Sequence, residues 1–252
     1  MKRSLPFHYD VDVYCECPIF YKLAVMKNHQ NYDDWLFNHG GVFMDGEFNA
    51  YLGRFGQRYR MEDFSPLLEF IPVDYRAFQS GEDLIRAMVQ ILSEGDYVLL
   101  EQGYPNKNTF IPDELWLHET VFYAIDTGKK TACSPDLRNG HFSEREQSFE
   151  EIIDCHELML KFYEDHACFA GQVREHAFPM CRIRLRHDTR EEANMLRFFH
   201  MLEQDFASGK TTTDYFDRDQ GRERQYVYRG ASEIFRGYRE WLDTREARDP
   251  EA

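Results

Sequence analysis

The chain has 252 residues, 42% of them apolar and 15% aromatic, which excludes a disordered protein and allows one large domain or two small ones. Its 45 acidic and 30 basic residues give a formal net charge of −15, which disfavours generic nucleic-acid or anionic-membrane binding. There is neither a membrane-spanning apolar run nor the apolar stretch of a signal peptide, so we expect a cytoplasmic protein with reduced cysteines.

The first predicted helix begins at a cysteine. Pro18 directly follows Cys17, and proline is favoured at the first position of a helix because its missing N–H has no intrahelical partner there. Cys17 is therefore the predicted N-cap of a helix to about Asn28. The helix dipole favours thiolate, the nucleophilic form, at such a position. Taken alone, however, such a cysteine is more often a buried apolar residue.

Two further helices are predicted before the middle of the chain. Residues 32–37 form a short one, and Ser80 with Asp83 resembles the capping box of a second, which Gly95 ends. The glycines between these helices match no dinucleotide or Walker motif, so we expect turns there rather than a phosphate site.

The next segment has the pattern of a β-sheet. Residues 97–100 are a short apolar run and residues 116–125 are rich in β-branched and aromatic side chains, so both are predicted strands, joined by a polar loop at 101–108. A turn at 126–129 leads to a third strand at 131–134, which Pro-Asp closes. Two apolar strands around a four-residue turn indicate an antiparallel hairpin.

The C-terminal part is mainly helical by periodicity. Helices are predicted from 148 to 163, at 191–206 and at 232–242, with a basic-faced strand at 181–186 and a polar loop at 208–224. We therefore expect an α+β protein. Its predicted parts are a core at 1–147, a mainly helical part packed on the core at 148–242, and a flexible tail at 243–252.

Three residue types suit nucleophilic catalysis. A cysteine nucleophile needs a base within reach, and the base needs a group that orients it. His118 lies at the head of one predicted strand and Asp136 just past its hairpin partner, so the two are predicted neighbours. Cys17, His118 and Asp136 are the candidate catalytic residues, with Asn139 and Asp126 as weaker orienting groups. A single histidine at a strand start is nevertheless more often structural.

Four stretches carry these motifs in order: CPIFYKLAVMK at 17–27, EGDYVLL at 94–100, LHETVFYAID at 117–126 and SPD at 134–136. This order resembles that of papain-like bacterial enzymes, namely the double-glycine bacteriocin-processing peptidases and the butirosin-biosynthesis protein H family. The later stretches, 183–210 and from 226 onward, resemble relatives of the butirosin protein that accompany bacterial peptide or polyketide assembly lines.

The resemblance implies a papain-like fold, with an N-terminal nucleophile helix packed on an antiparallel sheet. It implies that Cys17 is the nucleophile, His118 the general base and acid, and Asp136 the orienting residue. In the butirosin relatives the implied reaction moves an acyl group from a carrier-protein thioester to an amine in antibiotic biosynthesis, and in the peptidases it is amide hydrolysis. We expect an acyl or peptidyl carrier protein as partner, a small-molecule amine as acceptor, and no cofactor or metal.

Two positions depart from the family pattern. Val11 stands where the peptidases place a glutamine, about six residues before the cysteine, and Ala124 replaces a glycine. The side-chain donor to the oxyanion is then missing or supplied by Tyr9, Tyr14 or Gln102. This favours transfer from an activated thioester, which demands less of the oxyanion hole than peptide hydrolysis does.

Several alternatives stay open. They are a cysteine hydrolase acting on an amide or thioester, a non-catalytic binding or scaffold protein of the same fold, and a zinc site that includes Cys15 and Cys17, although C-x-C is tighter than the usual zinc spacing. Cys15 also competes with Cys17 as nucleophile. An acidic carrier protein would need a basic surface. Two groups of arginines are candidates: Arg182, Arg184, Arg186 and Arg190, or Arg222, Arg224 and Arg229.

Overall fold

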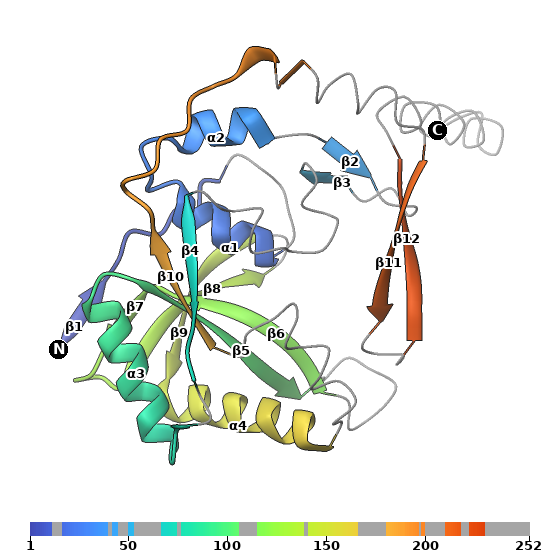
Figure 1. The fold of residues 1–252 in the computed structure, drawn as a ribbon. Coiled ribbons are helices and arrows are strands. Elements are labelled where there is room, and N and C mark those ends of the chain that lie inside the picture. Colours follow the sequence, from blue (N-terminus) through green and yellow to red (C-terminus); the bar gives the residue numbers. More distant parts are fainter. Residues whose placement is uncertain are drawn as a thin grey trace, which may run out of the picture. The chain divides into compact units, whose positions relative to one another are not determined.

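The structure is a computed structural model of the chain. It describes residues 1–11, 17–39, 42–44, 50–52, 67–74, 77–105, 115–138, 141–165, 180–196, 198–199, 210–217 and 222–229. These residues form four helices and twelve strands, so the predicted α+β class is confirmed (Figure 1). The chain divides into two compact units, of which the first comprises 1–11, 17–30 and 60–189, and the second 12–16, 31–59 and 190–252.

Two four-stranded antiparallel sheets form the framework of the first unit. Sheet 1 has the order β1-β7-β8-β9. Its strands are β1 (Lys2–Ser4), β7 (Ala124–Asp126), β8 (Thr131–Arg138) and β9 (His141–Ser148). In the β7–β8 pair Ala124 lies opposite Cys133, which confirms the predicted hairpin.

Sheet 2 has the order β4-β10-β5-β6. Its strands are β4 (Leu68–Pro72), β10 (Met180–Leu185), β5 (Tyr97–Pro105) and β6 (Leu115–Phe122). Strand β5 is buried from Tyr97 to Gly103, as a central strand covered on both faces should be. Because β10 inserts between β4 and β5, the two compact units do not coincide with the predicted division into 1–147 and 148–242.

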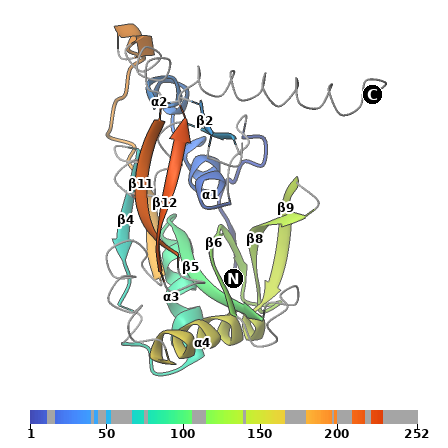
Figure 2. The same cartoon turned by 90° about the vertical axis from the view of Figure 1, so that its right-hand side faces the viewer.

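One run of chain is shared by the two sheets. The single strand predicted at 116–125 is two strands, β6 and β7, separated only by Tyr123. The Tyr123 N–H donates to the Cys133 carbonyl at 3.2 Å, and the Leu5 N–H donates to the Tyr123 carbonyl at 2.8 Å. Figure 2 shows β8 and β9 of sheet 1 beside β6 of sheet 2. The sheets therefore meet where β6 passes into β7.

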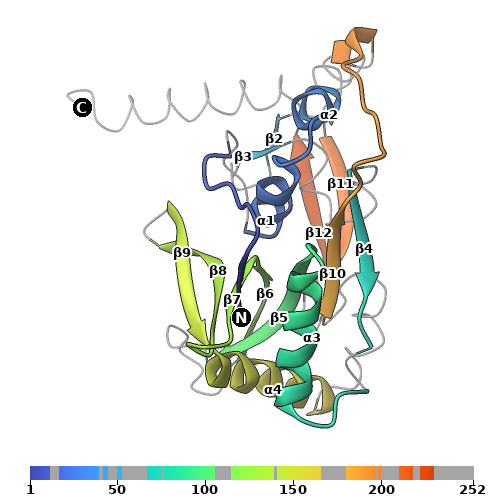
Figure 3. The ribbon, with the colours of Figure 1, turned by 90° about the vertical axis from the view of Figure 1, so that its left-hand side faces the viewer.

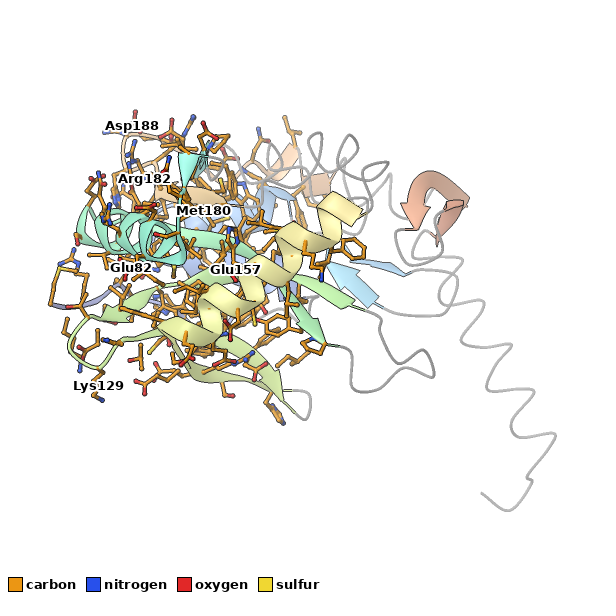
Figure 4. All side chains as sticks on the ribbon, turned by 90° about the horizontal axis from the view of Figure 1, so that it is seen from below. Glu82, Lys129, Glu157, Met180, Arg182 and Asp188 are labelled. Carbon is orange, nitrogen blue, oxygen red and sulfur yellow. The ribbon has the colours of Figure 1, made fainter. Side chains whose placement is uncertain are left out.

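Three helices pack on these sheets: α1 (Cys17–Met26), α3 (Gly81–Ser93) and α4 (Phe149–Asp165). Helix α1 contacts β6, and α3 and α4 both contact β5 (Figures 1 and 3). Seen from below, α4 runs across the strands, with Glu157 on it (Figure 4). The helices predicted from Cys17, from Ser80 and from 148 to 163 are thus confirmed, whereas residues 191–194 of the helix predicted at 191–206 are not helical.

The ends of α3 follow the sequence signals. Ser80 is the N-cap, and the Asp83 carboxylate accepts the Gln79 N–H at 2.9 Å and the Ser80 hydroxyl at 3.4 Å. The predicted Ser80 side-chain bond to the helix backbone is not formed. Gly95 has a φ of 92°, the left-handed conformation that favours glycine after a helix.

The second unit contains helix α2 (Tyr32–His39), which confirms the short helix predicted at 32–37. Asn38 Nδ2 donates to Glu191 Oε1 and to the Glu192 carbonyl, both at 2.8 Å, and so fixes the following segment to α2. Sheet 3 has the order β11-β12-β2-β3. Its strands are β11 (Lys210–Asp217), β12 (Arg222–Arg229), β2 (Val42–Met44) and β3 (Ala50–Leu52).

Two predicted loops are wrong in part. Residues 210–217, within the predicted loop at 208–224, form β11, because three threonines, a tyrosine and a phenylalanine favour extended backbone. Residues 101–105 extend β5, because they pair with β6. Pro135 lies inside β8 instead of closing it, opposite Glu144. The predicted helix at 232–242 and the tail at 243–252 lie outside the described residues.

A buried ion pair joins α1 to β6. All residues from Phe20 to Met26 are buried, and Lys22 among them is only 1% exposed. Lys22 Nζ lies 2.7 Å from Glu119 Oε1 on β6. Glu101 on β5, which is also buried, lies directly opposite Glu119. The charge of Lys22 is therefore balanced on sheet 2 by Glu119.

Replacing Lys22 with methionine would leave the Glu119 carboxylate, which is 20% exposed, without that cation. We expect Lys22→Met to lower the free energy of unfolding by about 3–5 kcal/mol, as for other broken buried ion pairs. Urea denaturation measures this change. Lys27→Met is the matched control, because Lys27 pairs with the exposed Asp10 at 3.1 Å, and exposed pairs contribute about 0–1 kcal/mol. Equal losses for both variants would contradict a special role for Lys22.

His156 on α4 makes stability depend on pH. Burial lowers the pKa of His156 to about 4, against a smaller opposing effect of a hydrogen bond with the Glu101 backbone. Below about pH 6.5 the unfolded chain takes up a proton that the folded chain does not, so stability falls as the pH decreases to about 4. Between pH 7 and pH 4, the free energy of unfolding should fall by about 3 kcal/mol less in His156→Gln than in the wild type. Urea denaturation at the two pH values measures this difference. His141→Gln, at an exposed position, should keep the wild-type slope.

Candidate functional site

Helix α1 begins at Cys17, as the sequence predicts. Tyr21 lies four residues later, and residues four apart lie on the same side of a helix. The side chain of Cys17 and all of Cys15 lie outside the described parts of the structure, so the choice between these cysteines stays a prediction. The described geometry of the site begins at Tyr21.

His118 lies on β6, within the strand and not at its head. Its ring centroid is 6.0 Å from that of Tyr21, with an interplanar angle of 70°, an edge-to-face contact. This contact brings the candidate base to α1, next to the turn that starts at Cys17. His118 therefore contacts the residue one turn after Cys17 in α1.

Burial lowers the pKa of His118, and the negative charges of Glu119 and Asp136 oppose this effect. The imidazole is thus mainly neutral at pH 7. A neutral imidazole can accept a proton from a thiol, as general-base catalysis requires. The environment of His118 suits a base more than a permanent cation.

Asp136 lies inside β8, opposite Ser143 on β9. The sequence prediction placed it in a turn after the strand, and that detail is wrong because β8 continues to Arg138. Its charge nevertheless acts on His118. Asp126, the weaker alternative, accepts hydrogen bonds from the Gly128 and Lys129 N–H groups in the hairpin turn. Asn139 lies outside the described residues.

A layer of polar side chains accompanies His118 and Asp136 in the first unit. Gln102, Ser134 and Gln147 are at most 1% exposed, and Thr120 is buried. Ser134 Oγ donates to Gln147 Oε1 at 3.1 Å within sheet 1, and the Tyr104 hydroxyl donates to Gln102 Oε1 at 2.5 Å within sheet 2. No periodic pattern or motif in the sequence predicts this layer.

Arg145 connects this layer to α4. Its guanidinium lies 5.4 Å from the centre of the Tyr104 ring and forms an ion pair with Glu151. Burial lowers the pKa of Arg145, but its electrostatic interactions with Tyr104, Glu151 and Asp136 raise it, and the net shift is upward. A fixed positive charge thus lies near Asp136, and sequence spacing did not indicate it.

The arginines of β10 have partners within the chain. Arg182 Nε lies 2.9 Å from Asp96 Oδ2, and Arg182 also pairs with Glu94. Arg184 pairs with the same Asp96 at 3.0 Å and with Glu69 at 3.3 Å. Figure 4 shows Arg182 beside α3. These ion pairs hold β10 to the turn after α3, so both arginines already have a structural role.

Comparisons with protein-family models, with curated proteins and with solved structures found no match. Within the described parts of the chain, no helix is long and apolar enough to cross a membrane. No group of three or more histidine, cysteine, aspartate or glutamate side chains there could hold a metal ion. Cys15 and the Cys17 side chain, which the zinc alternative needs, lie outside that search.

Replacing Asp136 with asparagine tests its link to His118. Because the Asp136 carboxylate raises the pKa of His118, we expect Asp136→Asn to lower this pKa further. An NMR titration of the His118 imidazole measures it. Asp126→Asn should leave the value unchanged, since that carboxylate serves the hairpin turn. An unchanged His118 pKa in Asp136→Asn would exclude Asp136 as its partner.

Proposed function

We propose that this protein is a cysteine acyltransferase of papain-like fold, with Cys17, His118 and Asp136 as its catalytic residues. The observation that carries the proposal is the contact between His118 and Tyr21, which places a neutral imidazole against the helix that begins at Cys17. The packing of this helix on an antiparallel sheet supports the proposed fold. The influence of Asp136 on His118 supplies the third partner.

The proposed reaction has two halves. In the first, Cys17 Sγ forms a bond to the carbonyl carbon of a thioester while His118 takes the thiol proton. The C=O π electrons move to oxygen and then return, breaking the bond to the carrier's sulfur, which leaves as a thiol with the proton from His118. In the second, an amine attacks the acyl-enzyme, its proton passes to His118 and then to Cys17 Sγ, and the amide leaves.

The resemblance in the sequence supports the choice of substrates. We propose an acyl or peptidyl carrier protein as donor and a small-molecule amine as acceptor, in a bacterial biosynthetic pathway in the cytoplasm. Cys133, Cys155 and Cys181, the three cysteines with described side chains, form no disulfide bond with one another. Arg182 and Arg184 already pair with acidic residues, so part of the charge of the first group of arginines is balanced within the chain.

Thiol labelling tests the nucleophile and base. We expect iodoacetamide to label Cys17 selectively near pH 7, and His118→Ala to slow this labelling at least about tenfold because the thiol loses its base. Peptide mapping identifies the labelled residue. Cys15→Ser is the control and should label at the wild-type rate. Labelling of Cys15 instead, or labelling independent of His118, would refute the proposed pair.

A model thioester then tests the reaction. Butyryl-N-acetylcysteamine should acylate Cys17, seen as a mass increase on that peptide, and a primary amine should accelerate loss of the acyl group. If water alone releases it as fast, the protein is a hydrolase. A wild-type chain that is neither acylated nor selectively labelled would be a binding protein.

A further inference from the structure

The strand beside His118 carries a buried hydrogen-bond donor. Gln102 on β5 lies directly opposite His118 on β6, so the two side chains project from the same face of sheet 2. Gln102 is 0% exposed, and its Nε2 has no hydrogen-bond partner among the described residues. A buried donor without a hydrogen-bond partner lowers the stability of the folded state, so its presence needs an explanation.

A hydrogen bond to its oxygen fixes the orientation of the Gln102 amide. The Tyr104 hydroxyl donates to Gln102 Oε1 at 2.5 Å. Because Oε1 is held by Tyr104, Nε2 is the free end of the amide. A donor held in advance costs no reorganisation when an acceptor arrives.

We propose that Gln102 Nε2 is the side-chain donor to the oxyanion of the acyl-transfer reaction, an inference that rests on the proposed function. As Cys17 Sγ attacks, the carbonyl oxygen of the thioester gains the π electrons and becomes negative. Gln102 donates to this oxygen and keeps its own proton throughout. When the C=O bond re-forms and the carrier's sulfur leaves, the oxygen is neutral again and the hydrogen bond weakens.

The burial of Gln102 is compatible with this role. His118 is partly exposed whereas Gln102 is buried, so the carbonyl oxygen of a thioester would have to point inward to reach the amide. A donor shielded from water acts on a developing charge in a low dielectric, where the interaction is strong. The substrate oxygen is therefore the acceptor that the buried amide lacks.

The other two candidates from the sequence are less suitable. The Tyr123 hydroxyl donates its proton to Glu144 at 2.5 Å. In the 3.0 Å hydrogen bond between the Tyr9 and Tyr123 hydroxyls, Tyr9 is therefore the donor. Tyr9 therefore has no proton left for an oxyanion. Tyr14 lies outside the described residues, and Val11, at the position usual in the peptidases, has no side-chain donor.

Two reactions of Cys17 separate this role from a structural one. Acylation by butyryl-N-acetylcysteamine passes through an oxyanion, whereas alkylation by iodoacetamide at a saturated carbon does not. We expect Gln102→Leu, of similar size but without the donor, to slow acylation about 10²–10³-fold while alkylation stays within about twofold of wild type. Tyr104→Phe, which retains the amide but frees its oxygen, should slow acylation less.

The outcomes are distinct. Equal slowing of both reactions in Gln102→Leu would assign Gln102 a structural role and overturn the proposal, as would unchanged acylation. If Gln102→Leu does not fold, as judged by circular dichroism, Tyr104→Phe decides by the same comparison of the two rates. A wild-type chain that is alkylated at Cys17 but never acylated would contradict the acyltransfer function itself, which is a separate failure.

Discussion

The ion pair between Lys22 and Glu119 is the constraint on which the candidate site depends. It lies in the interior, where two ions lose their hydration, so it fixes geometry more than it adds stability. Glu119 is the residue next to His118, and Lys22 is the residue next to Tyr21. The pair therefore sets how α1 lies on β6, and with it the edge-to-face contact of Tyr21 and His118. Hydrophobic packing alone would allow α1 to slide or rotate, whereas a buried charge can be paired in only one position.

The same strand also connects the two sheets. Because β6 and β7 are one run of chain interrupted at Tyr123, His118 in sheet 2 and Asp136 in sheet 1 belong to strands that lie side by side. The polar layer around them is unusual for a protein interior, where apolar packing is the rule.

Local signals in the sequence predicted local structure well. Pro18, Ser80 and Gly95 mark helix ends through backbone chemistry that each residue carries by itself, and α1 and α3 begin or end there. Features that depend on pairing could not be predicted in this way. Pro135 is typical of a turn but lies in β8, because β9 pairs with it. The polar residues 101–105 extend β5, because β6 pairs with them. The opposition of Gln102 and His118 is a matter of strand register, which no spacing in the sequence reveals.

The long separations within the first unit bear on how the chain folds during synthesis. Lys22 and Glu119 are 97 residues apart, and β1 pairs with β7 near residue 126. Contacts of such high sequence separation form slowly, since the loop between them must first close. The ribosome therefore releases α1 long before its partner strand exists, and sheet 2 is complete only once β10 emerges and inserts between β4 and β5. Until then the apolar helix that starts at Cys17 is exposed on the nascent chain, which makes it a natural binding site for a chaperone.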